Sequence, residues 1–281
     1  MKSNTHLFVE SLHADVYQSL TIDELLYEGK SEYQNIKIFH NKFFGKVLAL
    51  DDIIQTTEKD EFVYHEMLSH LPIFTHTSPK SILVIGGGDG GIIEEVLKHN
   101  TIDEVVLVEI DEMVVELSQK YLKSICNNAF YDTRLELIIG DGAEYIANTD
   151  KKFDIVIVDS PDPVGSAEVL FTKEFYESVK SVLKDEGIMA RQTGSSFYQI
   201  DELRKNYQLT SNIYPETKLF LAGIPTYIGG LFSFLIDSKS KLSLDINEIT
   251  KRFKESNIDT LYYTPEMHLS AFSIPPYILK G

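Results

Sequence analysis

The chain has 281 residues, and its 26 Lys and Arg residues against 43 Asp and Glu residues give a formal net charge of −17. An excess of acid this large repels phosphate backbones. It excludes a nucleic-acid binder that works through a basic patch and favours a cationic partner or substrate. Hydrophobic residues make up 43% and charged residues 25%, as in a globular fold with a buried core.

Two features bear on where the protein works. Residues 1–10 lack the apolar run of a signal peptide, and no apolar stretch is long enough to span a membrane. The single cysteine, Cys126, cannot form an internal disulfide or a cysteine-based zinc site. We therefore expect a soluble protein of the reducing cytoplasm that binds neither nucleic acid nor membranes.

The N-terminal part predicts a small antiparallel β-domain. Alternating segments rich in β-branched and aromatic residues occupy 33–40, 43–50 and 52–57. Apolar residues at helical spacing then predict a helix over 58–71. The pattern changes near residue 78, so we expect a β-meander domain with a linking helix at 1–78 and a larger domain at 79–281.

In the larger domain, strand-like and helix-like segments alternate. The apolar runs lie at 81–85, 104–109, 135–139, 154–159 and 187–192. The helical stretches between them lie at 91–99, 111–122, 142–148 and 172–184. Such alternation predicts an α/β fold with a doubly wound, Rossmann-like parallel sheet covered on both faces, whose ligand binds beyond the carboxyl ends of the strands. The tail carries one more amphipathic helix, at 245–256.

A glycine-rich loop follows the first of these strands. Gly86, Gly88 and Gly91 form a G-x-G-x-x-G pattern between a strand and a helix, and Glu109 ends the next strand. This context predicts an adenosine ligand, because the acid can accept hydrogen bonds from both ribose hydroxyls. Asp89 lies inside the loop, where an acid disfavours a pyrophosphate and suits a cation. The glycine pattern alone leaves a dinucleotide and a sulfonium nucleoside open.

Further acids follow the third and fourth strands. Asp141, beside Gly142, can accept from the exocyclic amine of adenine, or it can simply cap the helix that follows. Asp159 and Asp162 lie three residues apart in a proline-rich segment. Two acids at the edge of a pocket are costly unless a cation binds there, although a solvated loop is the alternative. Because Asp159 directly follows an apolar run, we expect it to be partly buried.

No metal centre is predicted. His65 and His70 resemble an H-E-x-x-H zinc motif, but their spacing is one residue too long. On a helix an offset of five residues turns the two imidazoles about 140° apart, so they cannot share an ion. Ser166 and Ser195 lack the context of a nucleophile elbow.

Together these motifs resemble the polyamine aminopropyltransferases, the family of the spermidine synthases. The resemblance covers nearly the whole chain and rests chiefly on GKVLALDDIIQTTEKDEFVYHEM (45–67), ILVIGGGDGG (82–91), VDSPDPVGSAEVLF (158–171) and IPTYIGG (224–230). It implies a methyltransferase-type sheet with an N-terminal β-domain, assembled as a homodimer or homotetramer. It also implies transfer of the aminopropyl group of decarboxylated S-adenosylmethionine to a diamine, putrescine, with release of methylthioadenosine. The donor is then a co-substrate, and no cofactor is expected.

The resemblance assigns most of the singled-out residues to the donor nucleoside. Glu109 would hold the ribose, and Asp141 with Gly142 the adenine. The other donor-side positions belong to the glycine loop, the adenosine side and the surroundings of the aminopropyl ammonium: Gly86, Gly88, Gln34, Asp89, Gln55 and His65.

The remaining positions belong to the amine. Asp159, with Tyr64 beside it, would receive the attacking amine, and Asp162, Gln192 and Tyr227 would line the acceptor channel. A primary amine has a pKa of about 10 and is protonated at neutral pH, so a base is required. We expect Asp159 to serve if burial raises its pKa.

Some positions depart from the family pattern. Pro161 replaces a small polar residue, Ser166 replaces a proline, and the chain has no Trp. These changes leave agmatine, cadaverine or spermidine open as alternative acceptors. Other classes that we considered are a small-molecule methyltransferase, an NAD-dependent oxidoreductase and a catalytically silent polyamine-binding protein. Asp89 disfavours the first two, and the presence of both Asp159 and Tyr64 disfavours the last.

Overall fold

The computed structural model describes residues 6–160 and 169–280. Its N-terminal part contains a hairpin of β1 (His6–His13) and β2 (Val16–Ile22), followed by an antiparallel sheet in the order β3-β4-β5-β6. The four strands of this sheet are β3 (Glu24–Lys30), β4 (Asn35–Asn41), β5 (Gly45–Leu50) and β6 (Ile53–Thr57). The predicted antiparallel meander corresponds to β4, β5 and β6. Between the last two strands, Asp51 and Asp52 both adopt positive φ, which a tight hairpin turn requires.

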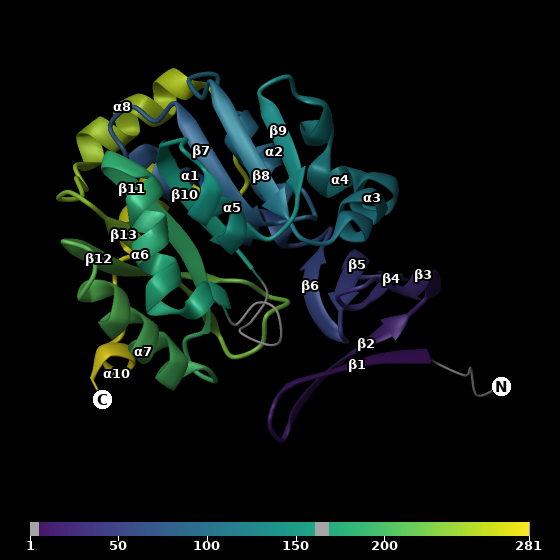
Figure 1. Cartoon of the computed structure of the whole chain (residues 1–281). Helices are drawn as coiled ribbons and strands as arrows, with labels where there is room; N and C mark the ends of the chain where they lie inside the picture. The colour runs from purple at the N-terminus through teal and green to yellow at the C-terminus, as the bar shows by residue number, and fades with distance from the viewer. Residues whose placement is uncertain (1–5, 161–168, 281) are drawn as a thin grey trace.

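The larger part is built on a seven-stranded sheet in the order β12-β13-β11-β10-β7-β8-β9 (Figure 1). Its strands are β7 (Ser81–Gly86), β8 (Glu104–Glu109), β9 (Leu135–Ile139), β10 (Phe153–Asp159), β11 (Leu183–Ser195), β12 (Glu216–Gly223) and β13 (Leu231–Ser238). The strands from β11 to β9 are paired in parallel, which confirms the predicted doubly wound sheet. The sequence patterns missed β12 and β13, and β13 is antiparallel to both of its neighbours.

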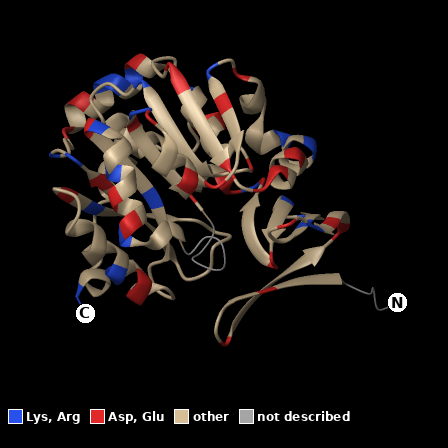
Figure 2. Ribbon diagram, in the orientation of Figure 1, with Lys and Arg blue, Asp and Glu red and all other residues tan. Residues whose placement is uncertain are grey.

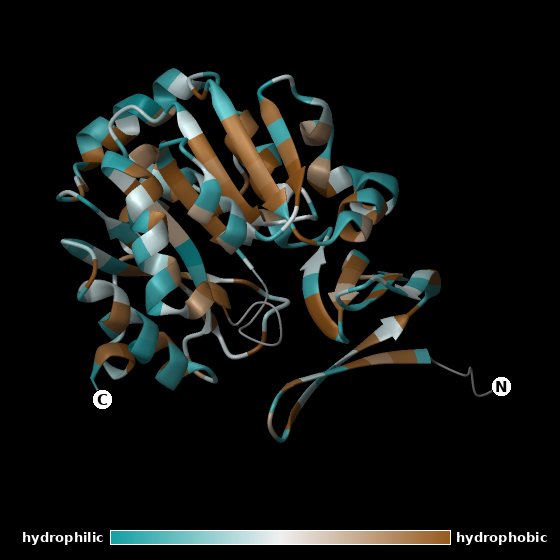
Figure 3. Cartoon of the chain, in the orientation of Figure 1, coloured by the Kyte–Doolittle hydropathy of each residue, from teal (hydrophilic) through white to brown (hydrophobic). Residues whose placement is uncertain are grey.

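Helices cover both faces of this sheet. One face is covered by α1 (Glu61–Thr75), α2 (Gly91–Leu97) and α8 (Ile246–Ser256), and the other by α5 (Gly142–Asn148), α6 (Lys173–Val182) and α7 (Ile200–Ser211). The shorter helices include α4 (Lys123–Cys126), the 3-10 turn η1 (Ala129–Tyr131), α9 (Pro265–Ser270) and α10 (Pro276–Leu279). Within β10, Ile155 and Ile157 pack on the α1 side and Val156 and Val158 on the α6 side. Figure 3 shows these central strands as almost continuously hydrophobic.

The helix α1 links the two parts of the chain. It begins at Glu61 and extends through Pro72 to Thr75, so it starts and ends later than the predicted 58–71. Its apolar residues Met67 and Leu71 are fully buried against the large sheet. On another side, the buried carboxylate of Glu66 accepts hydrogen bonds from three consecutive backbone N–H groups, those of residues 261–263. The C-terminal segment is thereby fastened to α1.

The N-terminal sheet packs on α3 (Glu112–Tyr121), which follows β8. Ile36 and Ile38 of β4 are fully buried against Val114 and Leu117 of α3. This contact places the N-terminal strands next to the carboxyl ends of the large sheet, the region where the ligand was expected. Among the described helices, none combines the length and apolar character that a bilayer span requires.

Candidate active site

A cavity lies at the carboxyl ends of β7, β8 and β10, and the N-terminal strands close it from the other side. Every predicted site residue that the structure describes lines this cavity: Gln34, Gln55, Tyr64, His65, Gly86, Gly88, Asp89, Glu109, Asp141, Gly142, Asp159, Gln192 and Tyr227. The remaining one, Asp162, falls outside the described residues. The tertiary structure therefore brings together residues that the sequence spreads over almost 200 positions.

Two glycines of the loop after β7 allow close packing around the cavity. Gly86 has a φ of +78°, and a Cβ there would lie 2.1 Å from the carbonyl oxygen of Asp159. A Cβ on Gly91 would lie 2.2 Å from the imidazole of His65. Side chains at these positions would force β7 away from β10 and α2 away from α1. The loop glycines thus allow side chains of α1, of β10 and of the loop after β7 to line one cavity.

Glu109 is held in place by the backbone. Its carboxylate accepts hydrogen bonds from the N–H groups of Gly88, at 3.1 Å, and Asp111, at 2.9 Å. Burial raises the pKa of Glu109 to about 7, although these two N–H groups counteract the effect. Asp111 in turn accepts from Ser31 and from the side-chain amide of Gln34. Sequence reasoning missed Asp111, whose only signal was its place two residues after Glu109.

Asp141 has the geometry of a helix cap and also lines the cavity. Its Oδ1 atom accepts from the N–H groups of Ala143 and Glu144, at 2.7 and 3.1 Å, which caps α5. Next to it, a Cβ on Gly142 would lie 2.4 Å from the side chain of Ile85. The two interpretations of Asp141 are compatible, because both capping bonds end on the same oxygen and the residue still faces the cavity.

A short hydrogen bond in the cavity joins Tyr64 and Asp159. The Tyr64 hydroxyl donates to Oδ1 of Asp159 at 2.5 Å. Burial, reinforced by the nearby charge of Asp89, raises the pKa of Asp159 from 3.8 to about 6, while His65 and Tyr64 act in the opposite direction. Burial and the Asp159 charge also hold the pKa of Tyr64 well above its ordinary value. The pair therefore consists of a protonated phenol and a carboxylate that can take up a proton close to neutral pH.

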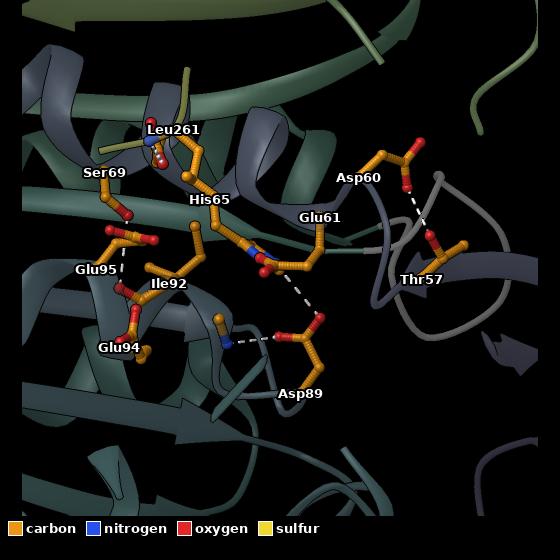
Figure 4. Close-up of polar contacts among 12 residues, drawn as sticks. Thr57, Asp60, Glu61, His65, Ser69, Asp89, Ile92, Glu94, Glu95 and Leu261 are labelled. Atoms are coloured by element: carbon orange, nitrogen blue, oxygen red, sulfur yellow. Dashed lines mark hydrogen bonds and ion pairs between the residues drawn. The ribbon is translucent and has the colours of Figure 1, made fainter. Parts of the chain in front are cut away.

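Next to this pair lies a chain of three charged side chains (Figure 4). Nδ1 of His65 is 2.6 Å from the carboxylate of Glu61, and its Nε2 is 3.4 Å from Asp89. Burial alone would lower the pKa of His65, but Asp89 and Glu61 outweigh it and hold that pKa well above the usual value. Burial likewise opposes ionisation of Asp89, but His65 and the N–H of Gly91 lower its pKa. Asp89 is thus an ionised carboxylate facing an imidazolium.

The ligand atoms of His65, Asp89 and Asp159 lie within 4.8 Å of one another, and in the described part of the chain this group could hold a metal ion. Both ring nitrogens of His65 already face carboxylates, those of Glu61 and Asp89. A metal would need one of these nitrogens deprotonated and turned to it. An ammonium group needs only carboxylate acceptors, so the arrangement suits an organic cation better.

Gln192 and Tyr227 also line the cavity, close to the Tyr64–Asp159 pair. The side-chain amide of Gln192 donates to the carbonyl of Ser160 at 2.9 Å and accepts from the N–H of Gly194 at 2.7 Å. The hydroxyl of Tyr227 donates to the carbonyl of Gln55. Both side chains are therefore fixed by backbone groups, and they shape the wall of the cavity more than they offer additional polar atoms.

Sequence reasoning missed several residues that line the cavity. Glu10 and His13 enter from the hairpin, where Glu10 accepts from the N–H of Ile54 at 2.8 Å and His13 stacks on Tyr198 with ring centroids 4.6 Å apart. Glu61, which contacts the cavity residue His65, escaped as well, although its spacing of four residues from His65 on a helix was a usable signal. The hairpin residues carried no motif, and their role follows from the way the hairpin folds back.

Acidic residues, red in Figure 2, gather where β7 and β8 end. Asp89, Glu109 and Asp159 all line one cavity, and the imidazolium of His65 lies 3.4 Å from Asp89. Such a cavity attracts a cationic ligand and disfavours a phosphate. The geometry agrees with the chemistry that the sequence resemblance implies.

Comparison with known protein families agrees with this geometry. A family model described as the spermine/spermidine synthase domain matches residues 61–247. The chain belongs to this family. A second model, the spermidine synthase tetramerisation domain, matches residues 7–58.

Relatives match over nearly the full length. A polyamine aminopropyltransferase of Thermoanaerobacter sp. (strain X514) is 48% identical over 273 residues, 96% of each chain. Polyamine aminopropyltransferase 1 of Pseudomonas aeruginosa is 41% identical over 276 residues, 98% of this chain and 96% of the relative. These matches make the protein a polyamine aminopropyltransferase, as the motifs predicted.

Solved structures share the fold. A crystal structure of spermidine synthase in complex with the transition-state analogue AdoDATO has a TM-score of 0.93 at 38% identity and covers 98% of this chain and 94% of its own. Spermidine synthase from Thermotoga maritima gives 0.90 at 37% identity, over 98% and 93% of the two chains. The predicted fold, a methyltransferase-type sheet with an N-terminal β-domain, is confirmed.

The raised pKa of Asp159 predicts a pH-dependent change in stability. A carboxyl whose pKa is higher in the folded state stabilises the fold fully below about pH 4, and this contribution is lost as the pH rises through about 6. We therefore expect Asp159→Asn to melt close to wild type at pH 4 and ~5 °C above it at pH 7. Differential scanning calorimetry across this range measures the change in melting temperature.

As a control, Asp132→Asn should change the melting temperature with pH in the opposite direction, because Arg134 lowers the pKa of Asp132. If the melting temperatures of Asp159→Asn and wild type differed by the same amount at every pH in this range, the prediction would be contradicted.

Proposed function

We propose that this enzyme transfers the aminopropyl group of decarboxylated S-adenosylmethionine to putrescine, giving spermidine and methylthioadenosine without a cofactor. The observation that carries the proposal is the Tyr64–Asp159 pair next to Asp89 in one acidic cavity. The resemblance of motifs 45–67 and 158–171 to spermidine synthases supports putrescine as the acceptor.

The donor nucleoside occupies the side of the cavity formed by the ends of β7, β8 and β9. Glu109, fixed by two backbone N–H groups, accepts from the ribose hydroxyls, and Asp141 with Gly142 borders the adenine. Gln34, held by Asp111, closes the adenosine side. Asp89 and Gln55 hold the ammonium of the aminopropyl tail, and His65 keeps Asp89 oriented.

The reaction is a nucleophilic substitution at carbon. The acceptor ammonium first gives one proton to Asp159. The resulting neutral amine attacks the methylene bonded to the sulfonium, a C–N bond forms, and the C–S bond breaks with its electron pair going to sulfur, so that the product is a protonated secondary amine. Tyr64 donates to the carboxylate of Asp159 and so orients it. With a pKa of about 6, Asp159 is largely ionised at neutral pH and yet a better base than a carboxylate in water.

The acceptor is tested with a panel of amines. We expect the highest kcat/KM with putrescine and values at least about tenfold lower with cadaverine, agmatine and spermidine, because the walls around Gln192 and Tyr227 are fixed by backbone groups. Mass spectrometry of the products formed with decarboxylated S-adenosylmethionine measures each rate. A higher kcat/KM with another amine would reject putrescine as the acceptor and leave the family assignment intact.

Asp159→Asn tests the proposed base with the same panel of amines. It keeps the size of the side chain and removes the proposed base, so turnover should fall by a factor of about 10³ with every amine. Donor binding in isothermal titration should stay within about threefold of wild type. Near-normal turnover would reject Asp159 as the base.

Asp89 predicts discrimination between donors. Ordinary S-adenosylmethionine carries a carboxylate that would approach the ionised Asp89, and like charges repel strongly in a cavity with little water. In isothermal titration we expect decarboxylated S-adenosylmethionine to bind at least about 100-fold more tightly than S-adenosylmethionine. Asp89→Asn should reduce this ratio of affinities. Equal affinities for the two nucleosides in the wild-type protein would contradict this role of Asp89.

We also propose that the chain forms a homodimer or homotetramer through the outer face of the β1–β2 hairpin. Residues of the inner face, Phe8 among them, pack into the N-terminal core, whereas Leu7, Val9 and Tyr17 are 55%, 49% and 70% exposed. The neighbouring outward positions are Ser or Thr, so the face is uncharged. The match of residues 7–58 to a tetramerisation domain supports this assembly.

Charge on this face should break the assembly. We expect Val9→Glu to reduce the mass measured by size-exclusion chromatography with light scattering, because a carboxylate would be buried without a partner. Tyr131→Glu is the control, since Tyr131 is 73% exposed and lies on η1, outside the hairpin. An unchanged mass for Val9→Glu, or the same loss for Tyr131→Glu, would contradict the assignment of the interface.

A further inference from the structure

Asp60 occupies the N-cap position of α1 but does not cap it. An Asp at this position ordinarily accepts from the second or third N–H of its own helix, which stabilises the helix by about 1 kcal/mol. No such side-chain bond forms here, although Asp60 is only 5% exposed. A buried carboxylate that leaves its own helix uncapped must have both oxygens satisfied elsewhere.

Both oxygens bind residues distant from α1. Oδ1 accepts from the hydroxyl of Thr57 at 2.6 Å (Figure 4). Oδ2 accepts from the backbone N–H of Thr226 at 2.7 Å and from the Thr226 hydroxyl at 2.5 Å. Thr57 and Thr226 are themselves buried. Asp60 therefore ties the start of α1 to a loop that lies 166 residues further along the chain.

The loop 224–230 carries part of the cavity wall. Tyr227 and Ile228, next to Thr226, line the cavity. The ring of Tyr227 stands edge-on to that of Tyr64, with centroids 6.0 Å apart. The carbonyl of Thr226 accepts from the side chain of Gln18 in β2, so both backbone polar groups of Thr226 are bound. The placement of the Tyr227 ring therefore depends on how Thr226 is held.

The same loop is confined on its far side. Gly229 has a φ of +104°, and a Cβ there would lie 2.4 Å from the hydroxyl of Ser195 and 2.6 Å from the ring of Tyr198. The loop thus sits between Asp60 on one side and Ser195 and Tyr198 on the other. It has little room to shift while the Asp60 contacts hold.

We propose that Asp60 is a positioning residue for the amine acceptor. It fixes the loop 224–230 and through it the Tyr227 ring beside Tyr64, without touching substrate itself. The inference rests on the proposed assignment of Tyr227 to the acceptor side. The next residue, Glu61, contacts His65 and so serves the donor side. Two consecutive acids at the start of α1 thereby hold the two halves of the cavity.

The test distinguishes an effect on the acceptor amine from an effect on the donor nucleoside. Asp60→Ala leaves the N–H and hydroxyl of Thr226 buried without their acceptor, so the loop relaxes. Using whichever amine the wild-type enzyme prefers, we expect the KM for the amine to rise at least about tenfold and the preference for that amine over one with a longer chain to fall. Donor affinity in isothermal titration should stay within about twofold. A shift in amine preference is a readout that a merely structural role would not produce.

Milder variants make the test independent of the folding of Asp60→Ala. Thr226→Val removes one of the two bonds to Oδ2, and we expect the KM for the amine to rise about threefold. Thr226→Ser keeps both bonds and should behave as wild type. Asp60→Asn should lie between wild type and Asp60→Ala, because an amide can still accept from Thr226 through its oxygen and donate to Thr57 through its nitrogen.

Asp154→Ala is the matched control. Asp154 is 7% exposed and likewise accepts from two backbone N–H groups and a hydroxyl, those of Lys80 and Ser81, at the start of β10 away from the cavity. Asp154→Ala should lower the Tm and leave both the KM for the amine and the amine preference unchanged. The proposal is overturned if Asp60→Ala and Thr226→Val keep the wild-type KM and preference, or if Asp154→Ala changes both equally. Because the preferred amine is determined beforehand, rejection of putrescine as acceptor would leave this test valid.

Discussion

The hydrogen bond from Tyr64 to Asp159 is the contact on which the cavity depends. It joins the first turn of α1 to the end of β10, across 95 residues of sequence. To form it, β7 and β10 must end close together, which Gly86 allows, and α1 must lie against the sheet, which its buried apolar residues ensure. Glu66 then fastens the same helix to the C-terminal segment. The site is rigid because the helix that carries Tyr64 is held by core packing and polar contacts together.

The carboxylates of the cavity differ in charge state because their surroundings differ. Glu109 and Asp159 are buried without a full counter-charge, and their pKa values rise to about 7 and 6. Asp89 faces the imidazolium of His65, and its pKa falls. One cavity thus contains an acid whose pKa is lowered beside an acid whose pKa is raised. This difference suits the proposed reaction, in which one ammonium stays charged and another amine loses its proton.

Much of the fold and of the site could be predicted from the sequence. The apolar runs predicted β7 to β11. For the inner strands β7, β8 and β10 the reason is that strands buried on both faces need nearly continuous hydrophobic residues. The hairpin β1–β2 and the strands β3, β12 and β13 escaped the prediction. The hairpin buries only one face, and the antiparallel pairing of β13 depends on where the sheet has room for another strand. For the same reason Glu10 and His13 could not be assigned to the cavity beforehand.

The sequence by itself indicated the family and many of the residues that line the cavity, because short motifs such as the glycine loop carry their geometry locally. The tertiary structure decided which of these residues act on one another. That Asp60 turns away from its own helix to hold Thr226, and that Glu61 faces His65 and through it Asp89, follows from the packing of α1 against distant segments. Hydrogen bonds and charges act through space over a few ångströms, so their partners are known only once the chain has folded.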